Sequence, residues 1–224
     1  LSISASNKII NQTDPSNFVG NISASQLHFA QSCTLNNESI ISAFNSGIIG
    51  NSQIVFDQGF NVVSGSVSIQ AINQGTLGSF GIDIQGSNSG GNANILLSNS
   101  SLNIGTTLTT FTIAGLDGDS TCFVQSQPQL IINTPASTQS EFSGIIQNYP
   151  ATTSSLMKTG TGTQKLTGAN TYTGLTTIQE GILIVNGSLA GNIITNPLGT
   201  LKGNGSINGT FTNMGTVSPG ESIG

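Results

Sequence analysis

The sequence has very little charge and contains no arginine. Only 6% of its 224 residues are charged, and four Lys against nine acidic residues give a net charge of −5. Nucleic acids and anionic membrane surfaces attract proteins through clustered cations, so this composition argues against both as partners. No apolar run approaches the roughly 18 residues of a membrane-spanning helix, so we expect no direct membrane insertion of this segment.

Other absences narrow the fold class. There is no Trp, aromatic residues make up 5%, and there are only two Cys. Two Cys are too few for a disulfide scaffold, and their spacing fits no zinc site. Strong helix formers are sparse, and no apolar stripe of helical period is present. The chain opens at Leu1 without an initiator Met or a signal peptide, so we expect a piece of a longer, exported precursor.

What the chain does contain is small polar residues and short strands. Gly, Ser, Thr and Asn make up nearly half of it, yet 35% of residues are apolar and the mean hydropathy is +0.10, so it should fold. Short stretches alternate apolar and polar residues and are bounded by Gly, Asn or Ser, which predicts an all-β protein with tight turns. These stretches are residues 67–71, 80–84, 108–113 (in part) and 182–185.

Two all-β architectures compete, an antiparallel sandwich and a parallel β-solenoid. The strands are very short, the turn signals are frequent, and the aromatic core of a typical sandwich is missing. In a solenoid, equivalent residues of successive coils stack about 4.8 Å apart, which suits small polar ladders and disfavours charge. The composition therefore favours the solenoid, with about ten coils of roughly 20–24 residues.

The C-terminal third carries a specific motif. Residues 156–178 read LMKTGTGTQKLTGANTYTGLTTI, and EGILIVNG follows at 180–187. This stretch closely resembles the passenger-associated transport repeat of bacterial autotransporters. GTLKGNGSI at 199–207 and GTVSPGESIG at 215–224 resemble the coils that follow it, although Glu221 departs from the Asn common there. We therefore divide the chain into this repeat with its following coils, 156–224, and a passenger segment, 1–155, assigned to the same fold by continuity.

The resemblance implies a right-handed parallel β-helix that is exported through the periplasm by type V secretion. A C-terminal outer-membrane β-barrel would lie beyond Gly224, and the passenger would be extracellular or displayed on the bacterial cell surface. The implied function is a non-enzymatic scaffold for adhesion or virulence, whose partners are a host-cell receptor or extracellular matrix. The alternative is a hydrolase, either a serine protease or a polysaccharide-cleaving enzyme, carried on the same scaffold.

The motif residues also have structural interpretations. We expect glycines at tight turns or close backbone approaches, and an inward apolar ladder. Asn170 and Thr173 can hydrogen-bond to turn backbone, Tyr172 can cover a corner, and Pro219 belongs in a turn rather than in a central ladder. The glycines are Gly160, Gly162, Gly168, Gly174 and Gly181, and the ladder residues are Leu156, Leu166, Ile178, Leu183 and Val185.

One set of residues has the chain order of a chymotrypsin-like triad. His28 is followed by Asp57 or Asp83, and then by Ser120 within Gly-Asp-Ser. However, Thr121 stands where a protease has Gly after its nucleophile, so we interpret Asp119-Ser120 as part of an Asx-turn.

Asp117 and Asp119 could offer carboxylates to calcium or to a glycosidase. Calcium needs six or more oxygen ligands, and lyases of similar fold use an Arg that this chain lacks. We therefore assign no catalytic, metal-binding or cofactor-binding residues and expect no enzyme activity.

The expected separation of the two Cys gives a test of the predicted solenoid. Cys33 and Cys122 are about four coils apart, beyond the roughly 7 Å Cα separation that a disulfide allows, so we predict both to be unpaired and mostly buried. Residues 11–20, 86–94 and 133–153 interrupt the strand rhythm, and we expect partner contacts on these loops.

Overall fold

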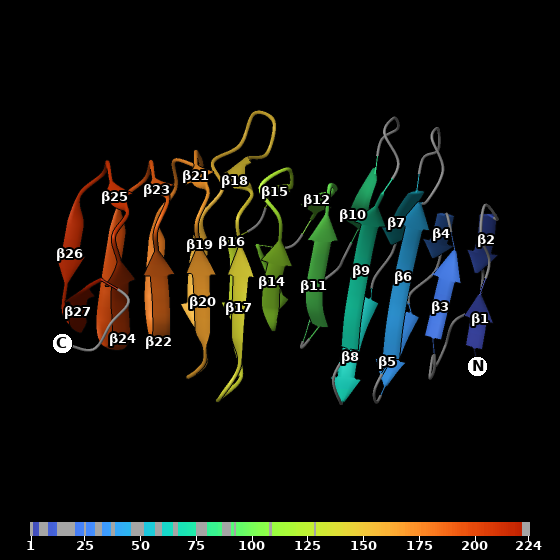
Figure 1. The fold of residues 1–224 in the computed structure, drawn as a ribbon, viewed down its shortest axis with the longest axis horizontal. Coiled ribbons are helices and arrows are strands. Elements are labelled where there is room, and N and C mark those ends of the chain that lie inside the picture. Colours follow the sequence, from blue (N-terminus) through green and yellow to red (C-terminus); the bar gives the residue numbers. More distant parts are fainter. Residues whose placement is uncertain are drawn as a thin grey trace.

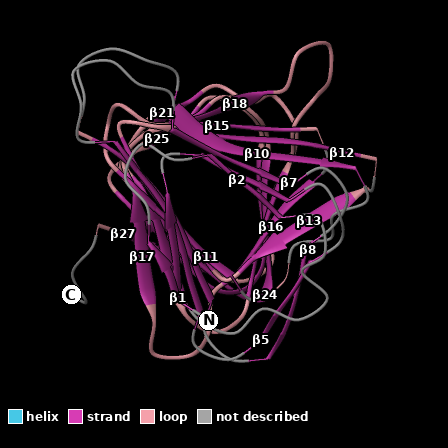
Figure 2. Ribbon diagram, turned by 90° about the vertical axis from the view of Figure 1, so that its right-hand side faces the viewer, coloured by secondary structure: helices cyan, strands magenta, loops and turns pink. Residues whose placement is uncertain are grey.

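The computed structural model describes residues 129–220 without a gap, residues 93–107 and 109–127, and, before these, the strands together with Gln74 and Gly91. All regular secondary structure in these residues is β-strand, and every strand pair is parallel. Nothing in this part of the chain forms a helix capable of crossing a membrane. Successive coils stack along one axis (Figure 1), and the end-on view shows a three-sided cross-section (Figure 2).

The first face is one continuous parallel ladder. In spatial order its members are β1 (Ser2–Ser4), β3 (Asn21–Ala24), β6 (Ser39–Asn45), β9 (Val67–Asn73), β11 (Ala93–Ser98), β14 (Gly115–Gly118), β17 (Gln139–Phe142), β20 (Thr163–Leu166), the second halves of β22 (Thr176–Val185) and β24 (Ile193–Gly203), and β27 (Thr216–Pro219).

The second face is equally regular. It joins β2 (Ile9–Gln12), β4 (Gln26–Phe29), β7 (Ser52–Phe56), β10 (Phe80–Gly86), β12 (Ser101–Thr106), β15 (Phe123–Ser126) and β18 (Ile145–Asn148). A short ladder of β21 (Ala169–Asn170), β23 (Ser188–Leu189) and β25 (Ser206–Ile207) follows it.

The third face has two parts. One pairs β5 (Cys33–Asn36) with β8 (Phe60–Ser64). The other joins β13 (Thr110–Ile113), β16 (Gln129–Asn133), β19 (Leu156–Thr159), the first halves of β22 and β24, and β26 (Phe211–Asn213).

This architecture confirms the predicted parallel β-helix and excludes the antiparallel sandwich. The number of coils differs slightly from the predicted ten, because the coils are not uniform. Lys202 pairs with Ser218, 16 residues later, whereas Ile41 pairs with Ile69, 28 residues later. The ladders run through position 155 without a break, since β16 pairs with β19 and β17 with β20. The division of the chain at that position stays a prediction.

The predicted strands are present, and one predicted loop is wrong. β9, β10 and β22 contain the alternating stretches 67–71, 80–84 and 182–185, and β13 begins at Thr110 within 108–113. The segment 133–153 is a regular coil that contains β17 and β18; its polar composition concealed their alternation. Of the other two loops, residues 13–20, 87–90 and 92 lie outside the described residues.

The core consists of columns of stacked side chains. On the second face, one inward column is aliphatic on five successive strands and fully buried: Ile54, Ile82, Leu102, Val124 and Ile146. Beside it, the rings of Phe29 and Phe56 stack with centroids 4.9 Å apart. The parallel register therefore places like residues in contact, and this buries apolar surface with few large side chains.

Phe142 gives a test of this core, because its buried ring lies against Gly118 of the preceding coil. We expect Phe142→Ala to lower the free energy of unfolding by about 3–5 kcal/mol in urea titrations, since it leaves a cavity. The neighbouring Glu141 points outward and forms only a surface ion pair, so Glu141→Ala should cost about 1 kcal/mol or less. Equal costs for the two variants would contradict the inward placement of Phe142.

Candidate functional site

The coil formed by residues 156–185 is built on an inward apolar ladder. Leu156 in β19, Leu166 in β20, and Ile178, Leu183 and Val185 in β22 are all buried, as the sequence predicts. In β19 and β20 the buried residues alternate with partly exposed ones, which is the pattern of a strand with one face on the core. The apolar residues of the motif therefore form part of the packed core.

Glycines allow this coil to lie close to its neighbours. Gly160 and Gly181 have φ of 68° and 73°, a conformation that favours glycine. At Gly181 a Cβ would also overlap the carbonyl oxygen of Gly160 in the preceding coil. Gly162, Gly168 and Gly174 likewise lie against carbonyl groups of the preceding coil. All five predicted positions are confirmed.

A lysine is buried in this coil. Lys158 is 0% exposed and occupies the inward column between Ile132 and Ile178. Its Nζ donates to the carbonyl oxygens of Thr159 at 2.6 Å, Gly160 at 2.7 Å and Glu180 at 3.4 Å. Burial lowers the pKa of Lys158 to about 8, and the nearby Glu180 carboxylate opposes this effect. The ammonium group therefore joins β19 to the following coil at a corner.

The corner after β21 is held by Asn170 and Tyr172. Asn170 accepts a hydrogen bond from the Ile146 N–H at 3.0 Å and donates to the carbonyl oxygens of Gly168 and Ser188, so it connects three coils. Tyr172 is fully buried, its hydroxyl lies 2.5 Å from the Thr176 hydroxyl, and burial raises its pKa. The predicted roles of both residues are confirmed.

Two smaller predictions were wrong. The Thr173 hydroxyl accepts a hydrogen bond from the Asn148 side chain rather than bonding to backbone, because Asn148 projects from the preceding coil toward it. Pro219 is the last residue of β27 rather than part of a turn. A proline is tolerated there because β27 pairs only with β24 among the described strands.

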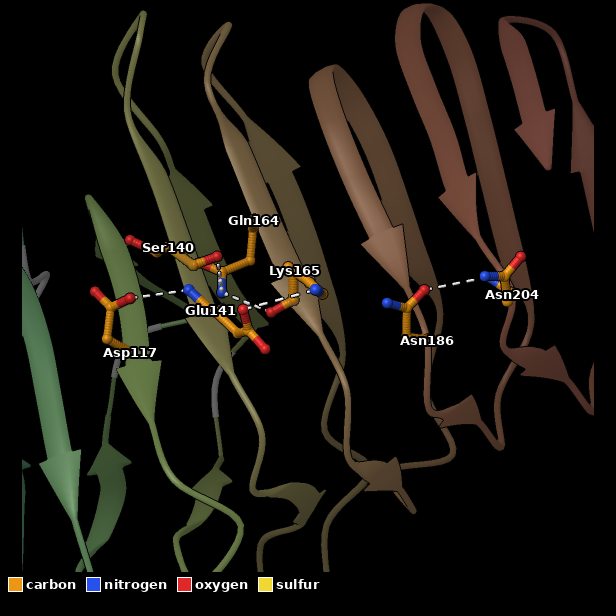
Figure 3. A network of polar contacts seen from close by, with 7 residues as sticks. All are labelled: Asp117, Ser140, Glu141, Gln164, Lys165, Asn186 and Asn204. Atoms are coloured by element: carbon orange, nitrogen blue, oxygen red, sulfur yellow. Dashed lines mark hydrogen bonds and ion pairs between the residues drawn. The ribbon is translucent and has the colours of Figure 1, made fainter. Parts of the chain in front are cut away.

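A second buried polar side chain crosses two coils. Gln164 in β20 is 0% exposed. Its Oε1 accepts from the Leu116 N–H at 3.1 Å, and its Nε2 donates to the Leu116 carbonyl at 2.8 Å and to the Ser140 carbonyl at 3.3 Å. Figure 3 shows Gln164 reaching across the coil of Ser140 toward the strand that carries Asp117.

The outer side of the same coils carries a chain of polar contacts (Figure 3). The Glu141 N–H donates to Asp117 Oδ1 at 2.8 Å, and Glu141 forms an ion pair of 3.7 Å with Lys165, its partner in β20. Burial raises the pKa of Asp117, and hydrogen bonds from Glu141 and Ser140 oppose this. Further along, the Asn204 N–H donates to Asn186 Oδ1 at 3.2 Å. Each contact joins consecutive coils.

The sequence analysis missed Lys158 and Gln164, although a signal was present. Each lies two residues from an inward leucine, Leu156 or Leu166, and period-2 alternation places both on the core side of the strand.

The residues with the chain order of a protease triad are not brought together. His28 lies on β4 and Asp83 on β10, two steps apart on the second ladder. Ser120 lies in an exposed turn before β15, two further steps away. At about 4.8 Å per step, His28 is about 19 Å from the strand that follows Ser120. Asp57 lies outside the described residues.

The turn at Asp119 is a structural one. Its carboxylate accepts hydrogen bonds from the N–H groups of Asn99 and Thr121, both at 2.9 Å, and from the Thr121 hydroxyl. Burial acts to raise its pKa, but these hydrogen bonds outweigh burial and hold the pKa at about 2. No cluster of three potential metal ligands occurs among the residues that the structure describes.

Cys122 adjoins this turn and is a free, buried thiol, as predicted. Burial raises its pKa, and its Sγ lies 3.5 Å from Asp119 Oδ1. The side chain of Cys33 lies outside the described residues.

Residues 156–185 match the family model of the passenger-associated-transport-repeat. Residues 156–185, which form part of the parallel β-helix, are therefore similar to the transport repeat of autotransporter passengers.

Curated relatives are similar to part of the chain. Over 71 residues the chain is 45% identical to an "Extracellular serine protease" of Serratia marcescens. The matched stretch covers 31% of this chain and 7% of the relative. Over 72 residues it is 43% identical to "Adhesin BmaC autotransporter" of Brucella suis biovar 1 (strain 1330), covering 30% of this chain and 2% of the relative. The chain therefore spans a small part of these relatives. No solved structure matches it.

The buried lysine predicts a pH dependence of stability. The unfolded chain keeps the Lys158 proton up to about pH 10.5, whereas the folded chain releases it at about 8, so this group makes stability rise between pH 8 and 10. Cys122 and Tyr172 act in the opposite sense above their ordinary pKa values of 9.0 and 10.0, because burial raises the pKa of both. Lys158→Met keeps both groups, so their contribution is the same in the two proteins.

We expect the free energy of unfolding of wild type, measured by denaturant titration, to rise between about pH 7.5 and 9.5. Lys158→Met should lack this contribution because it has no titrating group at this position. The partly exposed Lys165 serves as control, and Lys165→Met should behave as wild type. The same pH profile in wild type and Lys158→Met would contradict the assignment.

Proposed function

We propose that this chain is a non-enzymatic segment of an autotransporter passenger that serves adhesion to host cells or extracellular matrix. Residues 156–224 would aid folding and translocation, and an outer-membrane β-barrel would complete the full-length protein. The observation that carries the proposal is the transport repeat at 156–185, set within a continuous parallel β-helix. The similarity to a relative named as an adhesin supports it.

The physics of the coil supports a role in folding during export. Each strand pairs with the equivalent strand of the next coil, so contacts link residues close in sequence and a formed coil can template its neighbour. Asn170 fastens this coil to adjacent ones through hydrogen bonds to Ile146 and Ser188, and Lys158 joins its first strand, β19, to Glu180 in β22. A unit of this kind can fold first and remain folded while the rest of the passenger follows.

A polar column on the second face is the candidate contact surface for adhesion. Asp83, Asn103, Gln125 and Gln147 occupy one outward position on four successive paired strands. The Tyr149 hydroxyl lies at the same face, where a Cβ on Gly105 would come within 2.8 Å of it. The three neutral amides of Asn103, Gln125 and Gln147, at a regular spacing of about 4.8 Å, suit a partner recognised by hydrogen bonds rather than by charge.

The two proposed roles can be tested separately in the full-length precursor. Deleting residues 156–185 should strongly reduce the amount of passenger at the cell surface, because it removes the coil proposed to template folding. The triple variant Asn103→Ala, Gln125→Ala, Gln147→Ala should reach the surface normally and lose most of its binding to host cells or matrix. Quantitative surface labelling and a saturation binding assay measure these outcomes. Unchanged binding by the triple variant would contradict this contact surface, and normal display of the deletion would contradict the folding role.

The second candidate is a hydrolase, favoured by the similarity to a relative named as a serine protease. In this chain Ser120 is the residue to test, since it is exposed and follows Asp119. If the chain were a serine hydrolase using Ser120, a fluorophosphonate probe would label wild type and leave Ser120→Ala unlabelled. We expect no labelling of either, because His28 is about 19 Å away from the strand that follows Ser120.

A further inference from the structure

The ladder of the first face has a seam between β14 and β17. The pairing of these strands contains one residue pair, Gly118 with Phe142. The flanking ladders, β11 with β14 and β17 with β20, contain four pairs each. Continuing the register from Gly118 back by two residues places Leu116 opposite Ser140, where no backbone pair forms. The backbone groups of Leu116 therefore need other partners.

Side chains supply those partners. The amide of Gln164 binds both the N–H and the carbonyl of Leu116, at 3.1 and 2.8 Å, as a second strand would. On the outer side, the Asp117 carboxylate accepts the Glu141 N–H at 2.8 Å. Gln164 lies two coils beyond Leu116 and 48 residues later in the chain, so this contact is longer than any ladder step.

The seam has a steric cause. Gly115 lies so close to the Ser140 side chain that a Cβ would overlap the hydroxyl, and the Phe142 ring occupies the space beside Gly118. The coil of β17 thus carries a small polar residue, Ser140, opposite Gln164, and a large aromatic one, Phe142, opposite Gly118. Gln164, which is fully buried, fills the space under Ser140 and donates to its carbonyl at 3.3 Å.

We propose that Gln164 is a clasp through which the transport repeat holds β14, two coils upstream, in register across the seam. This deepens the proposed folding role of the repeat: its template would extend past the adjacent coil into the passenger segment. Lys158 and Asn170 form other hydrogen bonds between strands of the repeat, so the folding of the repeat does not depend on the clasp. The β14 strand depends on it for the backbone hydrogen bonds that β17 does not supply.

Native-state amide hydrogen exchange of the purified chain tests the clasp. Gln164→Met keeps the length and volume of the side chain and removes the amide. The Leu116 amide should lose protection by about tenfold or more, because a buried donor and acceptor lose their partners together. Amides of β22 and β24 should keep their protection.

Two further variants make the test specific. Asn170→Leu removes another buried amide of the repeat, whose reach is one coil, and should expose the Ile146 amide and not that of Leu116. Gln164→Glu should lose Leu116 protection at neutral pH, where a carboxylate faces the Leu116 carbonyl. At acidic pH it should regain this protection, because a carboxylic acid can donate to that carbonyl and accept from the N–H.

Two results would overturn the clasp: unchanged Leu116 protection in Gln164→Met, or an equal loss of protection from β14 to β24. If Gln164→Met does not fold, the pH-dependent difference at Leu116 in Gln164→Glu decides the question, and its absence overturns the proposal. These outcomes are independent of the deletion of 156–185, which tests whether the repeat aids export at all.

Discussion

The stacking of parallel strands, about 4.8 Å apart, is the constraint on which the rest of this structure depends. It brings every side chain beside its equivalent in the next coil, so like charges would repel along a whole column. Charge is therefore tolerated where opposite signs are paired, as in Glu141 and Lys165, which lie 3.7 Å apart on adjacent coils. The same constraint directs the backbone hydrogen bonds along the axis, so any gap in a ladder must be filled by a side chain.

Apolar columns alone exclude a shift by one residue, which would turn the aliphatic residues outward, but a coil shifted by two residues would still bury them. Buried polar groups define it more sharply, since a shift would leave them without partners, at a cost of about 1–3 kcal/mol each. Gln164 meets both backbone groups of Leu116, and Lys158 meets three carbonyl groups around one corner. We interpret these buried side chains as residues that fix the register of the coils.

Much of the fold could be predicted from the sequence, because alternation, glycine spacing and the ladder residues are local signals. Leu156, Leu166 and Gly181 take the predicted positions for this reason. The coil of β17 and β18 was missed because Ser140 stands where the pattern calls for an apolar residue, so its alternation is hidden. Leu116, whose backbone Gln164 binds, lies two coils away, and coil lengths that vary from 16 to 28 residues conceal that distance from the sequence.

The burial of the polar side chains in the transport repeat also decides which residues a ligand could reach. Lys158, Gln164, Asn170, Tyr172 and Thr176 are the polar side chains of the transport repeat that are fully or almost fully buried, and each is engaged with the chain itself. They are unavailable to a ligand, so a stretch of this kind is compatible with an adhesive or an enzymatic passenger alike. This explains how relatives named for adhesion and for proteolysis can resemble the same chain.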